Sequence, residues 1–175
     1  MSSQSGTGPR AWLAALVGTR TAPKVADTVL LVARVILAWI FIYHGARRLF
    51  GWFDGPGIKA SADYFANVAG LKPGTFFAVS GGIIEFFGGI ALALGLLTRL
   101  AAAGIVVDMV MAIVTVTWAN GINATGDKGG YELNLALACL ALVLVGFGAG
   151  RISLDALVER RLLRATPPVT ATGTG

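Results

Sequence analysis

Three ionisable residues lie near the centre of the bilayer if the long apolar stretches of the sequence cross it. Arg34 falls in the first of these stretches, and Glu85 and Asp108 lie near the middle of the second and the third. A charged side chain that faces lipid costs several kcal/mol, so all three residues are expected to turn inward. The simplest arrangement pairs Arg34 with Glu85, Asp108 or both, which predicts a buried polar site built from these three side chains.

One positive charge facing two carboxyl groups leaves a choice for the chemistry of this site. Either one carboxyl group stays protonated, or a further cation, a proton carrier or a polar ligand shares the site. Gly81 and Gly89 lie one turn before and after Glu85, so a neighbouring backbone or a flat ligand has room to approach the carboxylate. Buried arginine–carboxylate pairs also fix helix register in some bundles. The sequence leaves the functional and the structural interpretation open.

A second polar layer is expected at the outer ends of the apolar stretches, with His44, Arg48, Trp52 and Glu132 as its members. His44 is the only histidine, and its imidazole suits a proton relay or a hydrogen bond to a quinone carbonyl. The alternative is an interfacial histidine that pairs with Glu132. One histidine cannot supply both axial ligands of a haem, and no spacing matches a zinc or iron–sulfur site, so no metal is expected. Cys139 has no second thiol to pair with, so redox chemistry must use an external electron carrier.

The composition defines the class of protein that must position these residues. The chain has 175 residues, of which 55% are hydrophobic and 13% are charged. Soluble domains carry about 25% charged residues, so the sequence predicts an all-α integral membrane protein. A helix needs about 20 apolar residues to cross a bilayer. Four stretches meet this requirement, at about 27–46, 75–97, 99–119 and 131–149.

The flanking segments complete the predicted organisation of the chain. We expect a cytosolic tail over 1–26, a four-helix membrane domain over 27–150, and a cytosolic segment over 151–175. The connection between the first two spans contains aromatic residues and a turn cluster, and it is expected to form a short extracytoplasmic segment with a surface helix. After the last span, Ser153 is expected to cap an amphipathic helix that ends near Arg164, with a disordered tail beyond it.

The formal charge of +5 does not point to nucleic-acid binding. The basic residues lie at the ends of apolar stretches, where they face lipid headgroups, and they form no stripe with interleaved aromatic residues. More Lys and Arg residues fall on the side that holds both termini than on the other side. By the positive-inside rule, both termini are expected in the cytosol. The richness in Ala, Gly, Val and Arg indicates a bacterial source, and the spans indicate its plasma membrane.

The order of several short motifs resembles the DoxX family of bacterial membrane proteins. These motifs are Arg34, His44-Gly45, Arg48-Leu49-Phe50-Gly51-Trp52, Gly82-x-x-Glu85-x-x-Gly88-Gly89, Gly95-Leu96, Thr98-Arg99-Leu100-Ala101-Ala102, Glu132 and Ser153-Leu154-Asp155. The resemblance covers about residues 29–155. The family commonly has a lysine where this chain has Arg48, and its exit from the last span is usually Gly-Pro-Gly rather than Gly-Phe-Gly-Ala-Gly.

The resemblance implies a four-helix membrane bundle that belongs to a redox system, either quinone-linked or concerned with thiol and oxidative stress. Carried over by position, it points to Arg34, His44, Glu85 and Glu132 as functional residues, and to a soluble or membrane oxidoreductase as partner. Two alternatives remain open. The first is a proton-coupled carrier or channel for small solutes, which would require a homo-oligomer because four short helices enclose little volume. The second is a noncatalytic scaffold that docks partners on its C-terminal helix.

Overall fold

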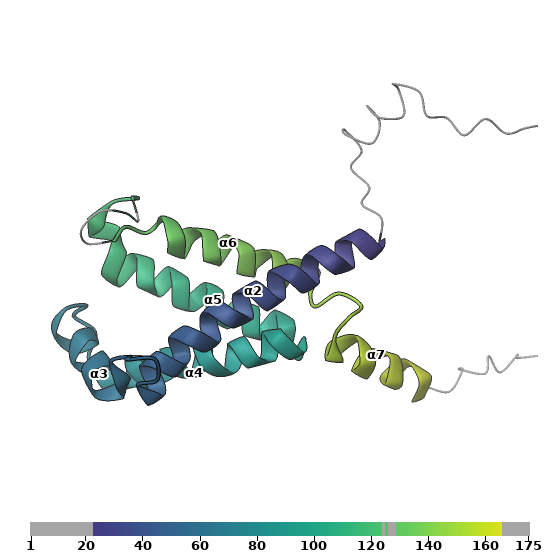
Figure 1. The fold of residues 1–175 in the computed structure, drawn as a ribbon, viewed down its shortest axis with the longest axis horizontal. Helices are drawn as coiled ribbons and strands as arrows, with labels where there is room; N and C mark the ends of the chain where they lie inside the picture. The colour runs from purple at the N-terminus through teal and green to yellow at the C-terminus, as the bar shows by residue number, and fades with distance from the viewer. Residues whose placement is uncertain (1–22, 124, 126–128, 166–175) are drawn as a thin grey trace, which may run out of the picture.

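The computed structural model describes residues 23–123, 125 and 129–165, and all regular structure in this part of the chain is helical (Figure 1). The elements are α2 (Pro23–Phe50), α3 (Gly57–Asn67), α4 (Gly74–Leu94), α5 (Thr98–Ala112), the π-helical turn η1 (Ile113–Thr117), the 3₁₀ turn η2 (Trp118–Asn120), α6 (Glu132–Phe147) and α7 (Leu154–Ala165).

Three helical segments are long and apolar enough to cross a membrane: Lys24–Phe50, Gly74–Leu94 and Thr98–Asn120. In length and composition they agree with the first three expected spans. The fourth, α6, is apolar but has only 16 residues. At 1.5 Å per residue it is about 24 Å long, compared with about 30 Å for the hydrocarbon core of a bilayer. It is shorter than the predicted 131–149 because Gly148, at φ 75°, ends the helix.

The helices pack as two antiparallel pairs, α2 with α4 and α5 with α6, which are joined through contacts between α4 and α5. Fully or almost fully buried apolar side chains from all four helices form the core. Its members include Leu37, Phe41, Leu92, Ile105 and Leu144. The expected all-α membrane bundle is therefore confirmed in its architecture.

A tight turn at Gly95 joins α4 to α5. Gly95 has φ 64°, and the Leu96 amide donates to the Ala91 carbonyl at 2.9 Å, which closes the end of α4. A side chain at this position would meet the guanidinium of Arg34 and the side chain of Ser153. Glycine is therefore required here both by the backbone conformation and by two segments that are distant in sequence.

The bundle has two different ends. The α3 end contains the last turn of α2, α3, the start of α4, η2 and the start of α6, whereas the α7 end contains the Gly95 turn, the end of α6 and α7 (Figure 1). The surface helix expected between the first two spans is α3. It packs against α4 because Gly74 leaves room for Ala62 and Ala66.

Candidate functional site

Arg48, in the last turn of α2, lies between two carboxylates in the interior of the bundle. Its Nη2 atom is 3.0 Å from Oε1 of Glu85, and its Nη1 atom is 3.9 Å from Oδ1 of Asp108. The side chain of Glu85 is 4% exposed and that of Asp108 is 13% exposed, whereas the side chain of Arg48 is 24% exposed. Three helices, α2, α4 and α5, therefore contribute one charged group each to a single cluster.

Small residues on α4 make room for the Arg48 side chain. A Cβ atom at Gly81 would meet Arg48 Nη1, and one at Gly82 would meet the side chain of Leu49. Where α2 passes α4, a Cβ atom at Gly45 would collide with the backbone of Phe86. These glycines bring the two helices close enough for an arginine at the end of α2 to reach the middle of α4.

The cluster has more acceptor oxygens than the described residues satisfy. Oε2 of Glu85 is buried and makes no hydrogen bond with the described part of the chain. The Glu85 and Asp108 carboxyl groups also interact with each other. With both carboxyl groups ionised the cluster carries a net charge of −1, and one bound proton makes it neutral. Its chemistry is therefore that of a proton-binding site beside a fixed cation.

A cavity of about 980 Å³ lies against this cluster at the α3 end of the bundle. Its walls come from α2, α3, α4, α5, η1 and α6, and most of its lining side chains are apolar. Ligand pockets for drug-sized molecules usually measure about 300 to 1,000 Å³. An apolar cavity of this volume with a few convergent charged groups has the features of a binding site for a small lipophilic molecule.

The polar groups of the cavity are gathered toward the α3 end. Arg48 lies over the ring of Phe65, with 5.4 Å between the guanidinium carbon and the ring centroid, so α3 contributes a cation–π contact to the cluster. On the opposite wall, the Asn134 amide donates to Oγ1 of Thr117 at 3.3 Å. His44 and Ser80 also line the cavity.

The expected partnership of Arg34 with Glu85 or Asp108 was wrong. The Arg34 guanidinium donates instead to the carbonyls of Ala149 at 2.7 Å and Ile152 at 2.8 Å, at the α7 end. Arg34 precedes Arg48 by about four helical turns, or about 21 Å along α2, so the two arginines occupy different ends of the bundle. The side chain of Arg34 is only 2% exposed, and it holds the segment that leads into α7.

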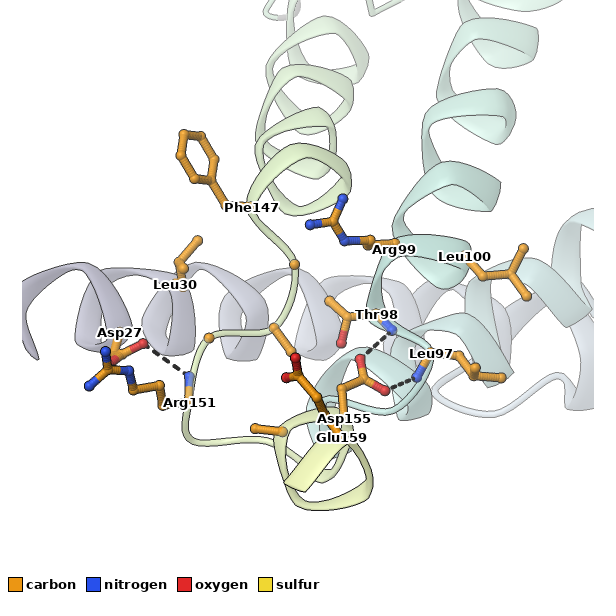
Figure 2. A pocket seen from close by; sticks show the side chains of 14 residues that line it. Asp27, Leu30, Leu97, Thr98, Arg99, Leu100, Phe147, Arg151, Asp155 and Glu159 are labelled. Carbon is orange, nitrogen blue, oxygen red and sulfur yellow. Dashed lines mark hydrogen bonds and ion pairs between the residues drawn. The ribbon is translucent and has the colours of Figure 1, made fainter. Parts of the chain in front are cut away.

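A second cavity, of about 690 Å³, lies at the α7 end (Figure 2). Two of its acidic residues bind neighbouring backbone. Asp155 accepts from the amides of Leu97 at 2.7 Å and Thr98 at 3.0 Å, and Asp27 accepts from the amide of Arg151 at 3.0 Å (Figure 2). These bonds cap α5 and attach α7 to the bundle. We therefore assign a structural role to these carboxylates.

The predicted cap of the C-terminal helix is confirmed, because Oγ of Ser153 accepts from the amide of Ala156 at 3.1 Å. Asp155 lies in the first turn of the same helix. Its role as the cap of α5 was missed, since sequence spacing does not show that residues 97 and 155 meet.

The expected outer polar layer divides into two sets. His44 and Arg48 line the large cavity, whereas Trp52 and Glu132 are exposed outside its lining. The Trp52 ring packs with Phe50, at 5.0 Å between ring centroids. No ion pair joins His44 to Glu132 in the described structure; the ring of His44 packs edge-on against Tyr43. The described residues also contain no group of three His, Cys, Asp or Glu side chains that could hold a metal ion.

Comparison with known proteins places the chain in a family. The DoxX family model matches residues 29–118. The chain belongs to the DoxX family. The matched region runs from α2 to η2 and includes the three residues of the cluster, Arg48, Glu85 and Asp108.

Two relatives of this DoxX protein cover most of its length. An uncharacterized membrane protein of Mycobacterium tuberculosis is 32% identical over 139 residues, which are 73% of this chain and 80% of that protein. An uncharacterized protein of Haemophilus influenzae is 29% identical over 133 residues, 75% of this chain and 83% of its own length. No solved structure gives a significant match. The family assignment and the apolar helices together establish a membrane protein of the DoxX family.

Proposed function

We propose that this DoxX-family protein is the membrane subunit of a redox system and that its large cavity binds a quinone. The observation that carries the proposal is the Arg48–Glu85–Asp108 cluster beside an apolar cavity of about 980 Å³. A quinone combines an apolar ring and tail with carbonyl acceptors. The cavity lining supplies apolar walls for the ring and tail, and the partly exposed guanidinium of Arg48 for the carbonyl oxygens.

The residues of the cluster suit the proton chemistry of a quinone. Reduction of a quinone to a quinol adds two electrons and two protons. Arg48 would donate hydrogen bonds to a carbonyl oxygen and favour the negative charge that develops there. Glu85 and Asp108 would hold or transfer protons at that oxygen, and His44, on the wall of the same cavity, would serve as a relay.

The electrons would come from a partner oxidoreductase, because the single cysteine of the chain cannot form a dithiol pair. The partner would be soluble or membrane-bound, and the chain itself would contribute the quinone site and the membrane anchor. A homo-oligomer within such a complex is compatible with the large apolar surface that α2 and α5 expose.

Quinone binding by the purified protein tests this proposal. We expect a short-tailed quinone to bind to the protein in lipid nanodiscs, and Glu85→Gln and Asp108→Asn to weaken the binding about tenfold each, since each removes a charged partner of Arg48. Asp63→Asn is the matched control, because Asp63 is an exposed residue of α3 outside the cavity lining. Equal binding by Glu85→Gln, Asp108→Asn and the unsubstituted chain would refute the assignment of the site.

A proton-coupled carrier is the second candidate function. The observation that favours it is the placement of two interacting carboxyl groups in the interior of a membrane bundle. A carrier should move a labelled solute into proteoliposomes in response to a proton gradient, and Asp108→Asn should abolish this flux. If the protein transports the solute and binds no quinone, the carrier function is favoured over the redox function.

The orientation in the membrane is part of the proposal. We place the chain in a bacterial plasma membrane with α6 as a fourth crossing, both termini in the cytosol and the α3 end outside. The charge bias of the sequence supports this orientation. A reporter that fluoresces only in the cytosol should be active when it is fused after residue 175 and inactive when it is inserted at Gly70, in the loop after α3.

A further inference from the structure

The large cavity contains groups from only one half of the bundle. Its walls begin at the very end of the bundle, with Pro56 and Leu71 beside α3 and with Thr117 and Leu133 on the opposite side. The carboxylate of Glu85 lies about 16 Å from the start of α4 at 1.5 Å per residue, which is about half the hydrocarbon thickness of a bilayer. The apolar lining continues about one turn further, to Ile40 and Phe41 of α2.

Between the cluster and the α7 end, the interior of the bundle is filled by apolar side chains. Leu37, Leu92, Ala102, Ile105 and Leu144 each have 0% exposure, and they come from α2, α4, α5 and α6. These residues belong to one contiguous core, and none of them lines the large cavity. Because these five residues have no exposed surface, a file of water molecules cannot pass along them.

The charged and titratable groups that face the cavity also come from the α3 side. They are His44, Arg47 and Arg48 from α2, Glu85 from α4 and Asp108 from α5, whereas α3 contributes Tyr64 and α6 contributes the neutral Asn134. Hydroxyl groups of Ser61, Ser80, Thr115 and Thr117 complete the polar lining. At the α7 end, the guanidinium of Arg34 is bound to backbone carbonyls and does not contact the cluster.

We propose that the cavity is a one-sided vestibule, through which Glu85 and Asp108 exchange protons with the α3 face of the membrane alone. Protons move through chains of water and polar groups, and such groups line the path from the carboxylates to the α3 face. The apolar core blocks the corresponding path to the α7 face. A single copy of the chain is then a half-channel that ends at the cluster.

This inference concerns access to the carboxylates and does not depend on which ligand binds. If a quinone reacts at the cluster, its protons are taken from or released to the α3 side. If the quinone proposal fails, the vestibule still predicts the side on which the two carboxyl groups titrate.

Cysteine accessibility tests the vestibule directly. In a Cys139→Ser background, we would introduce Ser80→Cys and Thr115→Cys on the cavity wall, and Ala102→Cys and Ala141→Cys in the core, where both alanines have 0% exposure. The reagent is a small, charged methanethiosulfonate that does not cross membranes. Two vesicle preparations of opposite orientation are used, one with the α3 face and one with the α7 face exposed to the reagent.

We expect the two wall cysteines to react at least about tenfold faster than the two core cysteines, and only when the reagent is on the α3 side. Reaction of Ala102→Cys or Ala141→Cys at a similar rate would show a continuous path and overturn the proposal. Protection of both wall cysteines from either side would overturn it as well, since the cavity would then be closed to water. No quinone is present in this assay, so its outcome is separate from the test of the proposed function.

Discussion

Arg34 and Arg48 lie on the same helix about four turns apart, and they stabilise different parts of the molecule. Arg34 binds the carbonyls of Ala149 and Ile152 at the α7 end, whereas Arg48 binds the carboxylates of Glu85 and Asp108 at the level of the cavity. The helix α2 thus carries one arginine that fixes the C-terminal segment and one that forms the candidate site.

This separation predicts different effects for the same substitution at the two positions. Arg34→Lys replaces a planar fork that binds two carbonyls with a single ammonium group, so we expect weaker attachment of α7 and unchanged ligand binding. Arg48→Lys should instead weaken ligand binding and leave α7 attached. Limited proteolysis near α7 and binding of a short-tailed quinone measure the two properties. An Arg34→Lys variant with impaired binding and a protected α7 would contradict this division.

Loss of the Arg48 side chain is expected to destabilise the bundle. Removing one partner of a buried ion pair costs about 3 to 5 kcal/mol, and the lower value is expected here because Arg48 is partly exposed. Chemical unfolding of Arg48→Met in detergent measures the loss. The double variant Arg48→Met/Glu85→Gln should recover part of it, because the glutamine leaves no unpaired negative charge on α4. If the double variant is no more stable than Arg48→Met, the ion pair is not the source of the effect.

Two glycines provide a matched test of helix packing. Gly45→Ala places a methyl group against the backbone of Phe86, so α2 and α4 must separate. We expect a loss of about 1 to 3 kcal/mol in the free energy of unfolding, as for other overpacked sites. Gly88→Ala meets only the Ala101 carbonyl at 3.9 Å and should be tolerated. Comparable stabilities of the two variants would show that the α2–α4 contact is looser than described.

The attachment of α7 depends on Asp155. Asp155→Ala removes the acceptor for the Leu97 and Thr98 amides, and loss of such a cap costs about 0.5 to 2 kcal/mol. We expect faster hydrogen exchange at these two amides and in α7. Glu159→Gln, an exposed change on the same helix, should leave exchange unaltered. If the Leu97 and Thr98 amides exchange no faster in Asp155→Ala, Asp155 does not cap α5.

Much of the architecture could be predicted from the sequence because lipid imposes simple requirements on it. Three apolar stretches became helices of spanning length, and Ser153 caps α7. These features depend on local composition and on capping preferences that act over a few residues. The short length of α6 follows from Gly148, which ends the helix within the glycine-rich exit of the last span.

The candidate site was predicted only in part, because charge pairing depends on register between distant helices. Glu85 and Asp108 were identified as an interior pair, but Arg34 was assigned as their cation in place of Arg48. The first span was expected to end near residue 46, which placed Arg48 outside it. The helix continues to Phe50, and the long Arg48 side chain reaches back along α2 into the bundle. Nothing in the spacing of one helix shows which of its arginines meets a partner on another.

The contacts of Arg34 have a consequence for the order of biosynthesis. Its two carbonyl partners lie 115 and 118 residues later in the chain, so the first membrane helix is made long before they leave the ribosome. Until then, the guanidinium must find temporary partners, and its position at the level of the Gly95 turn, at the α7 end of the bundle, allows it to reach toward the headgroup region of the bilayer. The final step of assembly is then the arrival of the segment 149–152, which closes the bundle only after all the membrane helices have been synthesised.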